Sequence, residues 1–290
     1  YAANVATRIA HSTIPDGIVQ ASLAAAANSS RPQRRVPRVC WCLLCCLLSM
    51  PVWALDPDKP FRQYIHDRWS IEDGLPQLSV LAITQDATGY LWLTTQNGVA
   101  RFDGVRFRVY NVENTPALRA NIIDKVHPGS DGSLWFGSSR GLTRYQDGQW
   151  TGIELQPGRD VAVAALANDI DGQLLAGTDR GLYRIDAAGV QVLGLRDRPV
   201  GAIARNGSTV YAASNREVHE INGENARVHP LPGGDNAPTV TALWAAPEGL
   251  YAGTRRGIFQ LDDTRWVVPD WAVPLAQHRI EALYRDSDGN

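Results

Sequence analysis

Four arginines occupy matching positions in this sequence and are the side chains best suited to recognising a ligand. They are Arg140, Arg180, Arg216 and Arg256, and they are spaced almost evenly along the chain. A guanidinium group offers five N–H donors in one plane, which suits carboxylates, phosphates and sugar hydroxyls. In a chain built from repeated units, these cations would line one face and could hold an anionic or sugar ligand. The alternative interpretation is that each arginine is a solvated turn residue without a binding role.

Metal and thiol chemistry have less support in the same sequence. Two segments, Asp169-x-Asp171-Gly172 and Asp286-x-Asp288-Gly289, resemble the start of a calcium loop but lack its further oxygen ligands and its closing glutamate. We therefore interpret both segments as turns. The histidines are scattered, and all four cysteines fall within residues 40–46, inside an apolar run. We expect no metal, no cofactor and no catalytic residue in this part of the protein.

The charge of the chain argues against nucleic acid as a partner. The whole sequence has a net charge of −2, and the segment 1–54 carries five arginines against one aspartate. The remainder therefore has a net charge of about −6, and its only lysines are Lys59 and Lys125. A protein that binds nucleic acid without a basic surface would lack the main source of affinity for phosphates.

The beginning of the sequence has the features of an export signal. Residues 1–38 are expected to be an unstructured leader or an over-extended reading frame. Residues 39–54 combine an apolar run with a small-residue cleavage site at Ala54, directly after a basic segment, which is typical of a secretory signal peptide. The apolar run is shorter than the roughly 20 residues that span a bilayer, so a retained anchor is the less favoured alternative. We expect an exported protein.

A repeat of short strands organises the rest of the chain. One large residue recurs at nearly equal intervals, at Trp92, Trp135, Leu175, Tyr211 and Tyr251. A period of about 40 residues, made of alternating strands and tight turns, is typical of a β-propeller blade. The sequence therefore predicts an all-β fold in which these residues are buried at equivalent positions.

One repeat contains enough signals for a complete blade. In the first copy, residues 80–84, 90–94, 99–102 and 105–110 read as strands, and Asn97-Gly98 marks a tight hairpin turn. We expect residues 55–79 to form an extended leader with a closing strand at 61–69, and residues 80–290 to form blades truncated at the C-terminus. A last innermost strand at 280–285 would begin a further blade. The predicted fold is an incomplete β-propeller of four-stranded antiparallel blades, about five and a half in number.

The repeats resemble a known family. The stretch from Gln85 to Gly104, with residues 69–77 before it, resembles the two-component regulator propeller repeat, which reads roughly Asp-x-x-Gly-x-Leu-Trp-x-Gly-Thr-x-x-Gly-Leu-x-Arg. The resemblance covers residues 61–290 and weakens in the fourth copy, where Glu217 replaces the turn glycine. It implies the periplasmic sensor region of an inner-membrane receptor, which would act as a homodimer. It also implies a later membrane helix and a cytoplasmic histidine kinase or diguanylate cyclase.

Strand direction predicts which side chains meet. In a four-stranded blade, the loop that leads into the first strand and the turn between the second and third strands lie at the same edge. From these loops and turns we select the candidate ligand-binding residues: Gln77, Asn97, Asn121, Arg140, Arg180, Arg198, Arg216, Arg256 and His278. Asp160 and Thr239 would lie on the same face. The expected ligand is a small polar periplasmic molecule, with carbohydrates among the candidates.

Two other functions are compatible with a propeller fold, because a fold does not determine a function. A secreted glycoside hydrolase or lyase would need paired carboxylates around a pocket, whereas the acidic residues here recur in turns such as that of Asp86. A secreted interaction scaffold is the third alternative. A membrane helix and a cytoplasmic catalytic domain in the intact gene would favour the sensor.

Overall fold

The structure, a computed structural model, describes residues 67–223 and 225–284. The predicted leader and signal peptide, and the closing strand up to residue 66, lie outside the described residues. Residues 67–69, at the end of the expected closing strand, form no strand. The described residues from Arg68 onward belong to one compact unit.

Each of the five repeats folds into a four-stranded antiparallel sheet whose strands follow sequence order. The first sheet contains β1 (Val80–Gln85), β2 (Leu91–Thr95), β3 (Gly98–Phe102) and β4 (Phe107–Tyr110). The second contains β5 (Ile123–Pro128), β6 (Leu134–Ser138), β7 (Gly141–Gln146) and β8 (Gln149–Ile153). The third contains β9 (Val163–Asn168), β10 (Leu174–Thr178), β11 (Gly181–Asp186) and β12 (Gly189–Gly194).

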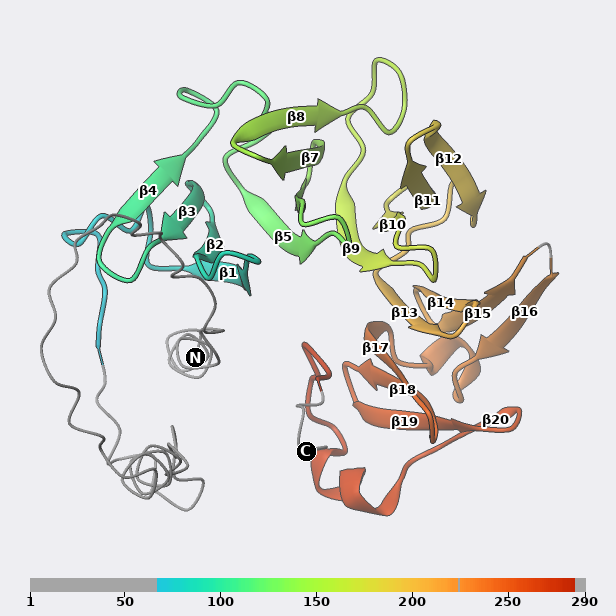
Figure 1. The fold of residues 1–290 in the computed structure, drawn as a ribbon. Coiled ribbons are helices and arrows are strands. Elements are labelled where there is room, and N and C mark those ends of the chain that lie inside the picture. Colours follow the sequence, from blue (N-terminus) through green and yellow to red (C-terminus); the bar gives the residue numbers. More distant parts are fainter. Residues whose placement is uncertain (1–66, 224, 285–290) are drawn as a thin grey trace, which may run out of the picture. The chain divides into compact units, whose positions relative to one another are not determined.

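The last two sheets repeat this arrangement. The fourth contains β13 (Ala202–Asn206), β14 (Thr209–Ser214), β15 (Glu217–Asn222) and β16 (Asn225–Pro230). The fifth contains β17 (Val240–Ala246), β18 (Gly249–Thr254), β19 (Gly257–Asp262) and β20 (Arg265–Val267). Two short 3-10 helices, η2 (Gly234–Asn236) and η3 (Asp270–Leu275), lie in the connections before and after the fifth sheet. Figure 1 shows the first strand of each sheet on the inner side, where successive first strands contact one another.

The recurring large residues occupy the predicted equivalent places, in the second strand of each sheet. Trp92 and Leu175 are completely buried, and Trp135 and Tyr251 are nearly so. Tyr211, in the degenerate fourth repeat, is half-buried. Each seam between neighbouring sheets contains its own cluster of buried apolar side chains. The β-propeller prediction is confirmed, because each blade buries its faces against its neighbours.

Glycine recurs where one blade meets the next. We call Gly137, Gly177 and Gly253 the seam glycines; they occupy the same position of the second strand in three blades. A Cβ atom added to each would come too close to a branched side chain on the segment that leads out of that blade. It would lie 2.7 Å from Val163 Cγ1 at Gly137, 2.8 Å from Val200 Cγ1 at Gly177 and 2.7 Å from Ile280 Cγ2 at Gly253. Because a real Cβ is not found so close to another heavy atom, the seams need glycine at these positions.

The expected innermost strand at 280–285 is not formed in the described part of the chain. Residues 280–284 have no sheet partner there, and residue 285 is outside the described range. The Ile280 N–H still donates to the Thr254 carbonyl at 2.9 Å, as the Val200 N–H donates to the Thr178 carbonyl at 2.7 Å. The described chain thus reaches the starting position of a further blade without forming a ladder there.

Candidate functional site

The turn between the second and third strands holds each arginine in a fixed position. In the third blade, the Thr178 hydroxyl accepts the Arg180 N–H at 3.0 Å and donates to the Gly181 carbonyl at 2.9 Å. Gly181 has a φ of 133°, and a Cβ atom there would lie 3.0 Å from the Gly194 carbonyl oxygen. The buried Thr178 hydroxyl therefore holds the backbone of the turn, while the arginine side chain extends into solvent.

The same hydroxyl motif occurs in the first, second and fifth blades, at Thr95, Ser138 and Thr254. The fourth blade differs, because Glu217 replaces the turn glycine. There, Asn215 takes the positive φ, at 57°, and the buried Ser214 hydroxyl has no hydrogen-bond partner among the described residues. The weak fourth repeat in the sequence therefore corresponds to a real change in the turn.

These turns hydrogen-bond to the loop that leads into the next blade. The Gly98 N–H donates to the Asn121 carbonyl at 2.8 Å, and the Gly257 N–H donates to the His278 carbonyl at 2.8 Å. The two sets of predicted residues, from the turns and from the loops, therefore lie along one edge of the blades. We call this edge, with its candidate residues and Asp160 and Thr239, the loop face.

The polar residues at the beginning of the loop face mainly bond to the protein itself. The Gln77 Nε2 donates to the Gln96 Oε1 at 3.1 Å. The Asn121 Oδ1 accepts the Val112 N–H at 2.9 Å. Asn97 is exposed in its turn. The side chains of Gln77 and Asn121 therefore connect parts of the protein to one another.

Arg140 is neutralised by an acidic neighbour. Its Nε donates to Asp160 Oδ2 at 2.8 Å, and Arg119 Nη2 lies 3.5 Å from Asp160 Oδ1. The hydrogen bond from Arg140, and then the charges of both arginines, hold the pKa of Asp160 below its usual value. Arg140 therefore takes part in an ion-pair cluster and does not present a free positive charge.

The next candidates also have partners close by. Arg180 Nε lies 3.8 Å from Asp179, and Arg198 Nη2 lies 2.6 Å from Glu217 Oε2. The hydrogen bond from Arg198 lowers the pKa of Glu217. The His278 Nδ1 is 3.3 Å from the Ala276 carbonyl oxygen. The predicted row of cations is thus uneven, and its charge is concentrated elsewhere on the face.

That charge is concentrated in a small hollow between the fourth and fifth blades. The hollow has a volume of about 210 Å³ and is lined by Arg216, Arg255 and Arg256 together with Asp235 and residues 236–239. We call it the arginine hollow. Its lining contains three arginines and one aspartate, so it carries an excess of two positive charges. Neither Arg216 nor Arg255 forms an ion pair within the described residues, and such groups bind oxyanions well.

The hollow has a built wall. The Arg256 Nη1 donates to the Asn236 carbonyl at 3.2 Å, which ties the arginine to the η2 segment. Sequence reasoning selected Arg216 and Arg256 but missed Arg255 and Asp235. The adjacent pair Arg255-Arg256 before a turn glycine was a usable signal, whereas the position of Asp235 depends on η2.

The calcium-like segment at Asp169 serves as a turn. The Asp169 carboxylate accepts the N–H groups of Asp171 and Gln173, each at 2.9 Å, and lies 3.2 Å from Arg184 Nε. No group of three or more histidine, cysteine or acidic side chains suited to a metal occurs in the part of the chain that the structure describes. The second calcium-like segment, at residues 286–289, falls outside that part.

Comparison with known proteins identifies the repeat. Residues 74–97 match the family model described as two component regulator propeller. The chain carries the two-component regulator propeller repeat. A stretch of 48 residues is 44% identical to histidine kinase P4 of Formosa agariphila. This stretch covers 16% of the chain and 4% of the kinase.

Solved structures support the propeller fold. An extracellular domain attributed to a hybrid two-component system of B. thetaiotaomicron matches with a TM-score of 0.59 at 20% identity, over 71% of this chain and 31% of that one. Virginiamycin B lyase from Staphylococcus aureus matches with a TM-score of 0.53 at 16% identity, over 65% of this chain and 68% of that one. The propeller thus spans under a third of the first structure's length. No helix among residues 67–223 and 225–284 is long and apolar enough to cross a membrane.

Proposed function

We propose that this propeller is the exported ligand-sensing region of a transmembrane signalling receptor. The intact protein would carry a membrane helix and a cytoplasmic histidine kinase or diguanylate cyclase. The two-component regulator repeat and the short match to a histidine kinase support this proposal. The ligand would be small, polar and negatively charged, and it would bind on the loop face.

The arginine hollow is the observation that carries this proposal. Its arginines come from two neighbouring turns, and Arg216 and Arg255 have no acidic partner in the described structure. A carboxylate or phosphate in the hollow would neutralise this excess charge and link the fourth blade to the fifth. Since a ligand shifts a receptor only by binding one state more tightly than another, a bond across two blades offers a route to such a preference.

The test uses the full-length receptor with glucuronate as the probe and glucose as its uncharged counterpart. Changing Arg216 and Arg255 together to alanine should weaken the response to glucuronate by about tenfold or more. A hydrogen bond between charged groups contributes about 1.5–3 kcal/mol, and each 1.4 kcal/mol is a factor of ten. Arg227→Ala, which removes an exposed arginine from the outer strand β16, is the matched control and should leave the response unchanged.

The readout is the dose dependence of autophosphorylation or of cyclic diguanylate synthesis, according to the output domain. An unchanged dose response in the double variant would remove the hollow from the site. An equal response to glucose and glucuronate would contradict the preference for an anion. Hydrolase or lyase turnover by the purified propeller alone would overturn the sensor proposal as a whole.

A further inference from the structure

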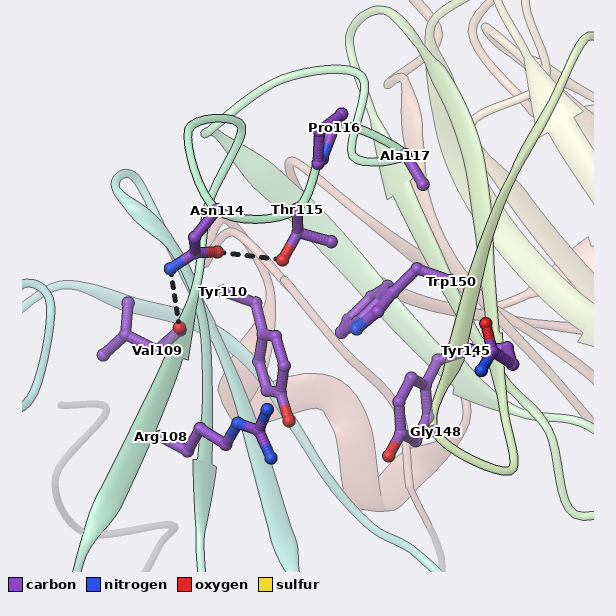
Figure 2. Close-up of a pocket in the computed structure, with 11 residues that line it drawn as sticks. Arg108, Val109, Tyr110, Asn114, Thr115, Pro116, Ala117, Tyr145, Gly148 and Trp150 are labelled. Atoms are coloured by element: carbon purple, nitrogen blue, oxygen red, sulfur yellow. Dashed lines mark hydrogen bonds between the residues drawn. The ribbon is translucent and has the colours of Figure 1, made fainter.

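A second and larger hollow lies between the outer strands of the first two blades, beside the loop that leads into β5. It has a volume of about 460 Å³, and its lining includes Arg108, Tyr110, Tyr145, Gln149 and Trp150. Figure 2 shows Tyr110 on the side of the first blade facing Trp150 and Tyr145 of the second. We call this hollow the aromatic cleft.

Aromatic rings that pack against one another at a tilt form one side of the cleft. The Trp150 ring centroid lies 4.9 Å from that of Tyr110 and 4.8 Å from that of Tyr145. Behind them, the fully buried Trp92 lies 4.7 Å from Tyr145. Tyr145 and Trp150 remain partly exposed, so part of this packed aromatic surface is available to a ligand. Flat apolar walls of this kind suit a planar ring, which can stack or meet them edge to face.

The upper wall of the cleft is held in shape by its own loop. The Asn114 Nδ2 donates to the Val109 carbonyl at 3.1 Å, and its Oδ1 accepts the Thr115 hydroxyl at 2.8 Å, as Figure 2 shows. The Thr115 N–H donates to the Asn111 carbonyl at 2.8 Å. Because these groups bond to one another, the cleft exists before a ligand arrives, which reduces the ordering cost of binding.

The charge beside the cleft is positive and is not balanced by an acid. Arg101 and Arg108 lie directly opposite each other in the β3–β4 ladder. Two like charges in that position repel each other. The arginines equivalent to Arg101 in the next two blades, Arg144 and Arg184, pair with Asp131 and Asp169.

Arg101 and Arg108 have no such pair within the described residues, and no acidic side chain lines the cleft. Asp86, which corresponds to Asp169 in the repeat, instead accepts the Trp92 Nε1–H at 2.7 Å. Arg101 lies over the Tyr90 ring, 4.4 Å from its centroid, and Arg108 lies over the Tyr110 ring at 5.2 Å, but neither cation has a counter-charge among the described residues. Arg108 and Gln149, which line the cleft, also make no hydrogen bond to another described side chain.

We propose that the aromatic cleft binds a small aromatic carboxylate. Its ring would pack against the partly exposed rings of Trp150 and Tyr145, because Tyr110 is buried and already touches Trp150. Its carboxylate would accept hydrogen bonds from Arg108, and its negative charge would relieve the repulsion between Arg108 and Arg101. This site is separate from the arginine hollow, so the propeller would carry two anion sites of different selectivity.

Binding is tested on the full chain by titration calorimetry and by quenching of tryptophan fluorescence, with 4-hydroxybenzoate as the probe. Three comparison compounds separate the two contributions: 4-hydroxybenzyl alcohol has the ring without the charge, acetate has the charge without the ring, and glucose has neither. We expect 4-hydroxybenzoate to bind about tenfold or more tightly than each of the three.

Arg108→Gln should weaken the binding of 4-hydroxybenzoate by about tenfold or more, and it should fold normally because Arg108 is exposed. Arg106→Gln is the matched control, since Arg106 is an exposed arginine just before β4 that does not line the cleft. The double change of Arg216 and Arg255 to alanine should have no effect here, which separates this proposal from that of the arginine hollow. Equal binding by the Arg108→Gln variant, equal binding of the alcohol, or saturation by glucose would each overturn the proposal.

Discussion

Replacing the seam glycine Gly177 with alanine tests how the blades are joined. A Cβ atom there would lie 2.8 Å from Val200 Cγ1 and 2.8 Å from the Val200 carbonyl oxygen. The carbonyl belongs to the backbone and cannot rotate away, so the third and fourth blades would have to separate slightly. Overpacking of this kind costs about 1–3 kcal/mol.

Gly201→Ala is the matched control for this change. Gly201 is exposed, and no heavy atom lies within 4 Å of the position of an added Cβ. Both substitutions restrict the unfolded chain and so gain about 0.4–1 kcal/mol from that source. The difference between the two variants therefore isolates the contact at the seam.

The measurement is the urea midpoint at constant m, with thermal melting as a second readout. We expect the free energy of unfolding of the Gly177→Ala variant to be about 1–3 kcal/mol lower than that of the Gly201→Ala variant. In a domain of this size, each kcal/mol shifts the melting temperature by about 2–4 °C. Equal stabilities for the two variants would refute the packing argument.

A double-mutant cycle sharpens the same test. At Gly137, the added Cβ would meet only side-chain atoms, chiefly of Val163. Val163→Ala should therefore offset part of the damage from Gly137→Ala, giving a favourable coupling energy. Val200→Ala should not rescue Gly177→Ala, because the carbonyl oxygen remains in place. Similar coupling at both seams would show that the backbone contact is unimportant.

Trp92→Ala should cost about 3–5 kcal/mol in urea melts, because the side chain is fully buried against other rings; a loss under about 1 kcal/mol would contradict its anchoring role. Thr178→Val removes the buried hydroxyl that closes its turn and should cost about 1–3 kcal/mol, whereas Thr151→Val, on an exposed strand position, should not; similar losses in both would contradict the turn argument. Burial lowers the pKa of both His127 and His219, so the unfolded chain takes up protons first as the pH falls below their ordinary value of 6.5. Stability should therefore be greatest above that pH and decrease on acidification, and a urea-melt series with the opposite trend would refute this.

The strand pattern of the blades could be predicted because the second strand of each blade and the turn after it repeat the same signals. The hydroxyl before the turn, the turn glycine and the buried large residue return with each period, and Glu217 correctly marked the weakest copy. The loop face could be predicted because the direction of antiparallel strands alone places its turns and loops together. What each arginine contacts could not be predicted, since the neutralisation of Arg140 depends on the position of Asp160 in an irregular loop.

The aromatic cleft was also beyond the reach of the repeat pattern. Its residues Arg108 and Trp150 belong to the outer strands β4 and β8, which have no shared signature between blades. The loop that forms its upper wall is fixed by side-chain hydrogen bonds of Asn114, which have no periodic signal. Where the chain departs from the repeat, its local conformation depends on individual side-chain contacts, which the sequence pattern does not predict.

The seam glycines have a consequence for how such a protein can change over generations. Each glycine belongs to one repeat and its branched partner to the next, so a copied repeat carries one half of each of its two seams. A tandem duplication of about one period would insert a blade that already fits its neighbours, and a deletion would leave two edges that match. The number of blades can then vary by recombination without new contact residues. The first and fourth seams are different, because Thr94 and Ala213 occupy the position of the seam glycine, and the first seam is filled by an aromatic cluster that includes Trp92 and Trp150. The first two blades are therefore expected to be inherited together.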